Sequence, residues 1–224
     1  MAKNPKPKFP SELRLDLISR DWVIIATGRG KRPEMFKTEK RVKVKIPNKK
    51  DCPFCNLEKQ ETPILIYSQG KKTNKIHNWT TVILPNKYPA FLPSPKFEKR
   101  IEGGLYQTMN AVGFCELVVT RDHKKHFSHF KIAQVKEILD AYQERYLELM
   151  KKPFVNYVSI FHNQGAEAGA SQSHPHSQII TTPLIDVDLQ KALDNSKIYF
   201  KKTGKCLYCQ MAGWERQVKK RIVF

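Results

Sequence analysis

The feature that most constrains the fold of this chain is one long amphipathic pattern in residues 132–150. Apolar residues recur there at spacings of three and four, as on a helix that buries one face: Ile132, Val135, Ile138, Leu139, Tyr142, Tyr146, Leu149 and Met150. Ser128 is a suitable N-cap residue ahead of the pattern, and Pro153 cannot continue a helix beyond it. The pattern therefore predicts one long helix between Ser128 and Pro153.

Short β-branched and apolar runs predict strands on both sides of this helix. Before the helix they are residues 21–26, 80–84 and 116–120, and after it they are residues 157–161 and 177–182. The last of these strands begins within a segment that carries two histidines, so its start is a candidate for a functional site.

The C-terminal part of the chain shows a weak echo of the first part. Residues 186–194 predict a short helix, and residues 221–224 predict the beginning of a strand. A Cys-x-x-Cys pair precedes that strand, as another such pair precedes the strand that begins at Thr80. We interpret this as an internal repeat whose second copy is only beginning when the chain stops.

Four of the five cysteines form these two pairs, Cys52 with Cys55 and Cys206 with Cys209. The Lys- and Pro-rich residues 1–10 have no apolar core, so they predict a flexible tail and not a secretory signal. Paired cysteines in a chain without such a signal indicate metal or redox chemistry, not a disulfide framework. A cytoplasmic location is the default expectation. No run of 18 apolar residues is present, so no membrane partner is expected.

The charge balance is strongly basic, with 40 Lys and Arg against 21 Asp and Glu and a formal net charge of +19. A nucleic-acid partner is one explanation of such a balance. The cations are mostly lysines scattered from Lys3 to Lys220, and no helix carries a basic stripe free of acids. We therefore expect a solvated surface whose field favours phosphates, and we do not expect nucleic acid as the partner.

The segment His174-Pro175-His176-Ser177-Gln178 contains the residue types that phosphate-transfer chemistry needs. In a strand, His174, His176 and Gln178 share one face, and Pro175 stiffens the pair of histidines. A neutral imidazole is both a nucleophile and a leaving group near pH 7, so His176 is predicted to attack a nucleotide phosphate. Two histidines on one face can instead share a metal, and plain surface histidines are a further alternative.

The loop before this segment, residues 163–173, is rich in glycine and alanine and contains polar Asn163 and Ser171. Small residues allow the backbone to approach a phosphate closely, although a flexible surface loop has the same composition. Arg29 and Arg32 flank a turn after the first strand. Their guanidinium forks match phosphate oxygens, and a solvated basic loop is the competing interpretation.

Cys52 and Cys55 match one half of a tetrahedral zinc site. His174 is one candidate for the other half. A second candidate is one of three histidines that follow the strand at 116–120: His123, His126 and His129. A redox dithiol or two plain buried cysteines remain the alternatives.

Several separated motifs together resemble the N-terminal part of the galactose-1-phosphate uridylyltransferase family, a branch of the histidine-triad superfamily. The resemblance extends from about residue 11 to residue 212, and it rests on these segments: Glu12–Arg14 with Asp21–Ala26, Arg29–Pro33 with Phe36, Cys52–Cys55, Pro85–Pro89 and Asn163–Gln178. The His-Pro-His-Ser-Gln segment is the most specific of them.

The resemblance implies a role for each candidate site residue. His176 matches the nucleophile that becomes uridylylated, and Gln178 is a catalytic residue at the transferred phosphate. Zinc is the implied cofactor, with a structural role and the ligands Cys52, Cys55, His123 and His174. The implied nucleotide and phosphate contacts are Arg29, Arg32, Asn86, Asn163, Gly169, Ser171 and Gln178, of which the two arginines can come from the partner subunit of a dimer.

The implied fold class is α+β, an antiparallel sheet with packed helices, built in the family from two histidine-triad-like halves. We expect residues 11–195 to form the first half and residues 196–224 to begin a second half that is truncated. The chain therefore resembles part of a longer enzyme that is a homodimer at full length. Cys115 replaces a histidine that is common in the family, and we expect it to be neutral or to compete as a ligand.

The function that the resemblance implies is transfer of a uridylyl group from UDP-glucose to a hexose 1-phosphate, such as galactose 1-phosphate, through a uridylyl-histidine. One alternative within the superfamily is an ADP-sugar or dinucleoside-polyphosphate phosphorylase, in which phosphate is the acceptor. Another alternative is a non-catalytic module that binds nucleotides or nucleic acid.

Overall fold

The computed structural model describes residues 11–17, 21–26, 48–165, 168, 170 and 172–222. Several candidates lie outside the described residues, namely the predicted tail at 1–10, Arg29, Arg32, Gly169 and Ser171. Their predicted roles are therefore not tested by the structure.

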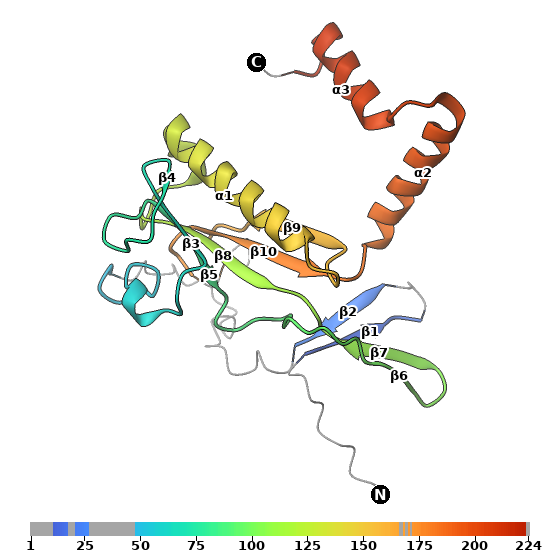
Figure 1. The fold of residues 1–224 in the computed structure, drawn as a ribbon, viewed down its shortest axis with the longest axis horizontal. Helices are drawn as coiled ribbons and strands as arrows, with labels where there is room; N and C mark the ends of the chain where they lie inside the picture. The colour runs from blue at the N-terminus through green and yellow to red at the C-terminus, as the bar shows by residue number, and fades with distance from the viewer. Residues whose placement is uncertain are drawn as a thin grey trace, which may run out of the picture.

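The main body is a six-stranded antiparallel sheet in the order β4-β3-β5-β8-β10-β9 (Figure 1). The strands are β3 (Leu65–Ser68), β4 (Lys71–Lys72), β5 (Thr81–Pro85), β8 (Cys115–Thr120), β9 (Tyr157–His162) and β10 (His176–Thr182). Four strands predicted from β-branched runs are confirmed to within one or two residues: β5, β8, β9 and β10. The strand β10 comes last in the sequence, yet it lies between β8 and β9.

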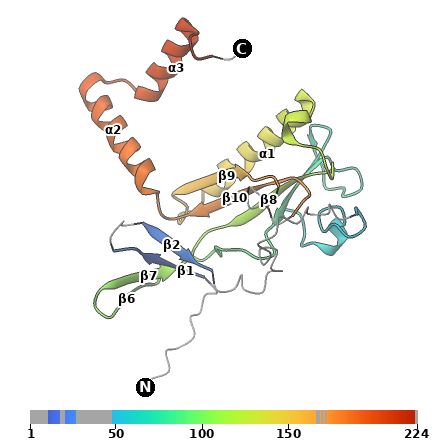
Figure 2. The same ribbon diagram turned by 180° about the vertical axis from the view of Figure 1, so that it is seen from behind.

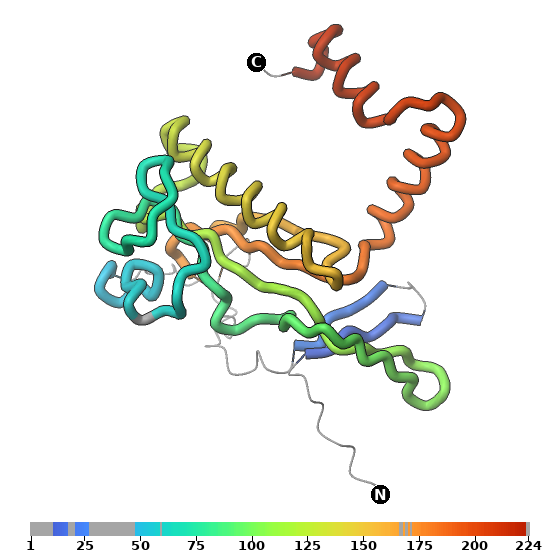
Figure 3. The backbone as a smooth tube through the Cα atoms, viewed as in Figure 1, coloured from blue at the N-terminus to red at the C-terminus, as the bar shows by residue number. Residues whose placement is uncertain are grey.

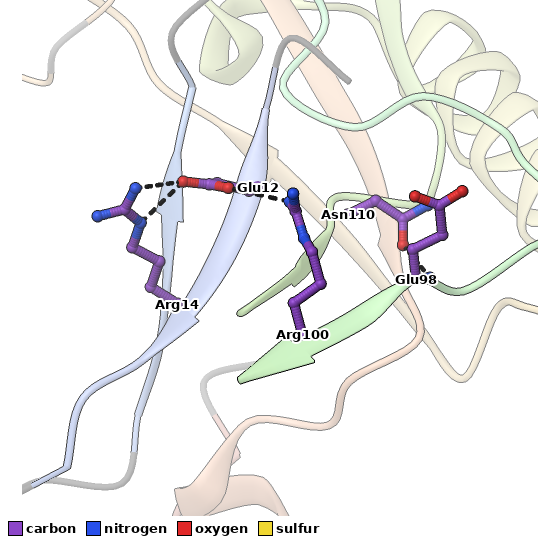
Figure 4. A network of polar contacts seen from close by, with 5 residues as sticks. All are labelled: Glu12, Arg14, Glu98, Arg100 and Asn110. Atoms are coloured by element: carbon purple, nitrogen blue, oxygen red, sulfur yellow. Dashed lines mark hydrogen bonds and ion pairs between the residues drawn. The ribbon is translucent and has the colours of Figure 1, made fainter. Parts of the chain in front are cut away.

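A smaller antiparallel sheet has the order β2-β1-β7-β6. Its strands are β1 (Glu12–Leu15), β2 (Trp22–Ile25), β6 (Lys99–Glu102) and β7 (Tyr106–Asn110). Leu13 and Met109 bury one face against Phe91 and Leu184. On the opposite face Glu12 accepts hydrogen bonds from Arg14 and Arg100, and the Asn110 side chain accepts from the backbone of Glu98 (Figure 4).

The predicted long helix is confirmed as α1 (Ile132–Met150), which covers one face of the six-stranded sheet (Figures 1 and 2). Ile138, Ala141 and Leu149 are buried on the side of α1 that faces the strands. Ser128 is not the N-cap, and that prediction was wrong. It lies in a separate turn, η3 (Phe127–His129), and the extended residues Phe130 and Lys131 follow before the helix begins.

The opposite face of the sheet is partly covered by a short loop, residues 48–60, that contains Cys52 and Cys55 and the turn η2 (Leu57–Lys59). We call this loop the cysteine knuckle. Its buried residues Cys52, Phe54 and Leu57 form one cluster with apolar side chains of the sheet and of the loop before β5. These side chains are Ile66, Trp79, Val82, Leu84, Leu117 and Val119. The knuckle thus brings its two thiols to the face that lies away from α1.

The C-terminal helices α2 (Val187–Thr203) and α3 (Leu207–Val218) extend away from the two sheets (Figure 3). Asp186 caps α2 by accepting from two backbone N–H groups, and Gly204, in a left-handed conformation, ends it. The helix predicted at 186–194 is therefore present but longer, because no breaker precedes Gly204. Arg221 and Ile222 are not in a strand, so the prediction for 221–224 is wrong for these two residues, and the others lie outside the described part.

Candidate functional site

The nucleophile candidate begins the strand β10 and points away from α1. Gln178 pairs with Leu117 of β8 on one side and with Phe161 of β9 on the other. Side chains alternate along a strand, so His176 and Gln178 share the face that carries the cysteine knuckle. His176 is 7% exposed, and the centre of its ring lies 5.0 Å from that of Phe54. Sequence reasoning missed Phe54, although its place between the knuckle cysteines was a usable signal.

One backbone contact decides which nitrogen of His176 can react. The Nδ1 atom lies 3.0 Å from the carbonyl oxygen of His174. A carbonyl oxygen only accepts, so Nδ1 carries the proton and donates it to this bond. In the neutral ring the lone pair then resides on Nε2, the nitrogen that a nucleophile must present.

Four side chains gather beside the nucleophile into a cluster that could hold a metal ion: Cys52, Cys55, His123 and His174. The Sγ atoms of Cys52 and Cys55 lie 3.4 and 3.5 Å from Nδ1 of His174, which itself lies 3.2 Å from Nδ1 of His123. A tetrahedral zinc ion with bonds of about 2.0–2.3 Å places its ligand atoms roughly 3.3–3.8 Å apart. The spacing and the donor set are therefore compatible with zinc.

The fold explains why distant residues meet in this cluster. His123 follows the end of β8 and His174 precedes the start of β10, and these two strands are antiparallel neighbours. Antiparallel pairing places the end of one strand beside the start of the other. The cysteine knuckle packs on the same face, so all four ligand atoms converge. His126 and His129, the other candidates, are exposed and lie outside the cluster.

Burial prepares the cluster for a cation. His174 donates from Nε2 to the carbonyl oxygen of Thr120 at 2.7 Å, which turns the lone pair of Nδ1 toward the thiols. Burial lowers the pKa of His174 to about 4, so this ring is neutral near pH 7. Burial and the neighbouring Cys52 raise the pKa of Cys55 to about 11. A bound cation would stabilise the thiolates of buried Cys52 and partly buried Cys55.

The family model for galactose-1-phosphate uridyl transferase, N-terminal domain, matches residues 5–185 of the chain. The chain belongs to this family. The predicted resemblance is confirmed, and the match includes the cysteine knuckle, β8, β10 and all four residues of the cluster.

Known relatives of this uridylyltransferase-family chain include enzymes of two kinds. An ADP-glucose phosphorylase from Arabidopsis thaliana is 33% identical over 201 residues, which make up 89% of this chain and 56% of that protein. A galactose-1-phosphate uridylyltransferase from Thermotoga maritima is 27% identical over 212 residues, which make up 93% of this chain and 58% of that protein. The chain thus spans somewhat more than half the length of these relatives.

Solved structures agree with the sequence match. A uridylyltransferase structure is similar with a TM-score of 0.62 at 27% identity, covering 90% of this chain and 55% of that one. An ADP-glucose phosphorylase from Arabidopsis thaliana with bound ADP-glucose is similar with a TM-score of 0.58 at 28% identity, covering 91% and 58%. The predicted α+β class with antiparallel sheets is confirmed.

Two further family positions lie near the nucleophile strand or the strands beside it. Asn163 directly follows β9, the strand that pairs with β10, and is partly exposed. Asn86 directly follows β5, and its side-chain oxygen accepts from the backbone of Tyr88 at 3.0 Å. Both side chains are partly exposed, at the ends of β5 and β9.

The remaining cysteines of this family member have different surroundings. Cys115 is buried on β8 opposite Ile180, accepts from the backbone of Phe91 at 3.5 Å, and is not part of the metal cluster. Cys206 and Cys209 lie exposed at the start of α3. Among the described residues, no other histidine, cysteine or carboxylate joins them in a metal cluster. In this same part of the chain, no helix has the length and apolar character needed to cross a membrane.

Proposed function

We propose that this chain provides the nucleotide-transferring half of an enzyme that works through a covalent nucleotidyl-histidine, with His176 as the nucleophile. The observation that carries this proposal is the hydrogen bond from Nδ1 of His176 to the carbonyl oxygen of His174, at 3.0 Å. It assigns the proton to Nδ1 and the lone pair to Nε2, and the family membership supplies the class of reaction.

In the first step, Nε2 of His176 attacks the α-phosphorus of a nucleotide sugar. A phosphorus–nitrogen bond forms while the bond from phosphorus to the leaving sugar phosphate breaks, so a sugar 1-phosphate departs. The carbonyl oxygen of His174 accepts a hydrogen bond from Nδ1 and so stabilises the positive charge that develops on the ring of His176. Gln178 lies on the same face and donates its amide hydrogens to the non-bridging oxygens of the α-phosphate. These hydrogen bonds stabilise the negative charge on those oxygens in the transition state. An acceptor oxygen then attacks phosphorus, and the phosphorus–nitrogen bond breaks.

Cys52, Cys55, His123 and His174 would hold zinc, which neutralises the thiolates and fixes the segment from His174 to His176. The role is structural, because all four ligand positions are protein atoms and none is open for substrate. In this chain His174 is thus a ligand, and His176 alone acts as the nucleophile.

The nucleotide contacts expected from the family are part of the same proposal. Asn86 binds the nucleotide, while Asn163, Gly169 and Ser171 lie around its phosphates. Arg29 and Arg32 bind phosphate, within one subunit or from the partner subunit of a homodimer. Residues 11–195 form the catalytic domain, and a second domain begins near residue 196, within α2.

The substrates that we propose are UDP-glucose and a hexose 1-phosphate such as galactose 1-phosphate. The test uses the intact protein with UDP-glucose that carries a radioactive α-phosphate. We expect label that is stable in base, labile in acid and absent from His176→Ala. Label that persists in His176→Ala would refute the proposed nucleophile.

An ADP-glucose phosphorylase is the second candidate, because the Arabidopsis thaliana relative of that activity is 33% identical over most of this chain. The same experiment with ADP-glucose labels His176 under this alternative. The two activities differ in the acceptor. If inorganic phosphate discharges the labelled protein and galactose 1-phosphate does not, the enzyme is a phosphorylase.

A further inference from the structure

Directly behind the nucleophile, polar side chains from three elements of the fold meet at one hydroxyl. Ser177 follows His176 in β10, and its Oγ lies 2.5 Å from the hydroxyl of Tyr142 in α1. The same Oγ lies 2.9 Å from Nδ1 of His162 in β9. Because side chains alternate along β10, Ser177 faces α1 while His176 and Gln178 face the metal cluster. We call Ser177, Tyr142 and His162 the serine anchor.

The two hydrogen bonds of the serine anchor join uncharged groups. Burial raises the pKa of Tyr142, so its phenol keeps its proton and forms a hydrogen bond with the hydroxyl of Ser177. Burial lowers the pKa of His162, so its ring is neutral near pH 7 and shares a hydrogen bond with the hydroxyl of Ser177 through Nδ1. The side chain of Gln164 is a further hydrogen-bonding neighbour of this ring.

Holding the sheet together does not require this arrangement. Backbone pairing already joins β10 to β8 and β9, and Ile179, two residues farther along, packs in the apolar cluster that includes Ala141 of α1. A buried hydroxyl must form hydrogen bonds to offset the cost of leaving water, and Ser177 forms them with Tyr142 and His162. The polar group is placed between the nucleophile and Gln178, the two residues of β10 that act on the phosphate.

We propose that the serine anchor positions the nucleophile, an inference that rests on the proposed function of His176. The metal cluster fixes the backbone on one side of His176 through His174. The serine anchor fixes it on the other side through Ser177, by tying β10 to both α1 and β9. Held at both neighbours, the ring of His176 stays aligned with the α-phosphorus. The three residues of the serine anchor are positioning residues, because they lie on the face away from the nucleotide.

The test is the rate at which His176 becomes labelled by UDP-glucose or ADP-glucose with a radioactive α-phosphate. A misplacement of about 1 Å slows such chemistry by roughly 100-fold, so we expect Ser177→Ala to lower the maximal labelling rate by about 10- to 100-fold. The half-saturating nucleotide-sugar concentration should not change, because the hydroxyl does not face the nucleotide. Ser177→Thr keeps a hydroxyl and should restore most of the rate. Tyr142→Phe, which removes one bond, should have a smaller effect in the same direction.

Thr181 supplies a matched control on the same face of the same strand. Its hydroxyl is buried and accepts from the backbone of Phe114 at 2.8 Å, but it lies at the end of β10 far from His176. We expect Thr181→Val to lower the melting temperature as Ser177→Ala does, and to label at the normal rate.

Two outcomes would overturn the inference while leaving the nucleophile in place. One is normal labelling by both Ser177→Ala and Tyr142→Phe. The other is an equal slowing by Thr181→Val, which would indicate general loosening of the strand. If Ser177→Ala does not fold, Tyr142→Phe and Ser177→Thr decide alone. Absence of label from the unmodified protein is a different result, in which the proposed function fails and the serine anchor loses its role with it.

Discussion

The two Cys-x-x-Cys pairs of this chain have the same spacing and opposite surroundings. Cys52 and Cys55 lie in the cysteine knuckle, packed on a sheet, with two histidines within 3.5 Å of a thiol. Cys206 and Cys209 lie exposed on the first turn of α3, where no residue is buried. The Cys-x-x-Cys spacing therefore identifies two thiols, but it does not show whether they belong to a metal site. The other half of the site depends on histidines that lie 68 and 122 residues away from their cysteine partners along the chain.

The same contrast gives the thiols different chemistry. In the knuckle pair, desolvation raises the pKa of Cys55 to about 11, and a bound metal ion would provide the charge that stabilises the thiolate. In the exposed pair, the first cause of the lowered pKa of Cys206 is the hydrogen bond from the backbone N–H of Cys209, while the side chain of Cys206 raises the pKa of Cys209. One pair thus lies in a cluster that could hold a cation, and the other presents two thiols to solvent.

The largest expected difference between the pairs is in metal content. We expect Cys52→Ser to lose bound zinc and to lose stability by several kcal/mol, because metal binding and folding are coupled. Cys206→Ser should keep the zinc of the first site and unfold at nearly the normal temperature. Elemental analysis and thermal unfolding of the two variants check this. Equal loss of zinc from both would mean that the pairs are equivalent.

The choice of histidine sharpens the comparison further. His123→Ala should reduce zinc affinity by more than the roughly 10- to 100-fold typical when a residue that supports a ligand is lost. His126→Ala removes an exposed histidine three positions away and should leave the affinity unchanged. Competition with a coloured chelator measures both. An effect of His126→Ala as large as that of His123→Ala would contradict the ligand set.

The aromatic residue before the second cysteine of each pair offers a matched test of packing. Phe54 is 5% exposed and touches the rings of His174 and His176, whereas Tyr208 is 50% exposed. Phe54→Ala should therefore cost about 3–5 kcal/mol of unfolding free energy. Tyr208→Ala should cost about 0.5 kcal/mol or less. Denaturant unfolding measures both values, and similar costs would show that α3 is packed as tightly as the cysteine knuckle.

The smallest expected effect concerns thiol reactivity. In protein stripped of metal, Cys206 should react with iodoacetamide about tenfold faster than Cys55 at pH 7.5, because its pKa is lowered and it is exposed. Mass spectrometry of timed samples gives the two rates. Faster reaction at Cys55 would mean that removal of the metal opens the cysteine knuckle.

Local patterns predicted much of this fold and the chemistry of its site. The periodic apolar residues predicted α1, and the β-branched runs predicted the strands that carry the nucleophile. Of the smaller sheet, only β2 was predicted, from the run at 21–26. The rest was missed because the pairing joins β1 to β7 across almost a hundred residues, which no local pattern records. The helix α3 could have been predicted, since Leu207, Met211 and Trp214 recur at helical spacing.

The candidate site was predicted unevenly, for a physical reason. Residue chemistry suggested His176 and the two knuckle thiols. It did not distinguish His123 from His126 and His129, because that choice depends on where β8 ends relative to β10. Backbone contacts, such as the carbonyl of Thr120 that orients His174, have no signature in the sequence at all.

The position of β10 inside the sheet has a consequence for protein synthesis. A ribosome releases β8 and β9 before β10, yet β10 is the only neighbour of β9 among the strands that the structure describes. Until residues 174–182 emerge, a nascent chain carries three of the four residues of the candidate metal cluster, and the edge of β8 stays open to association with other chains. Chaperone access while residues 174–182 are still being synthesised should therefore affect the yield of folded protein.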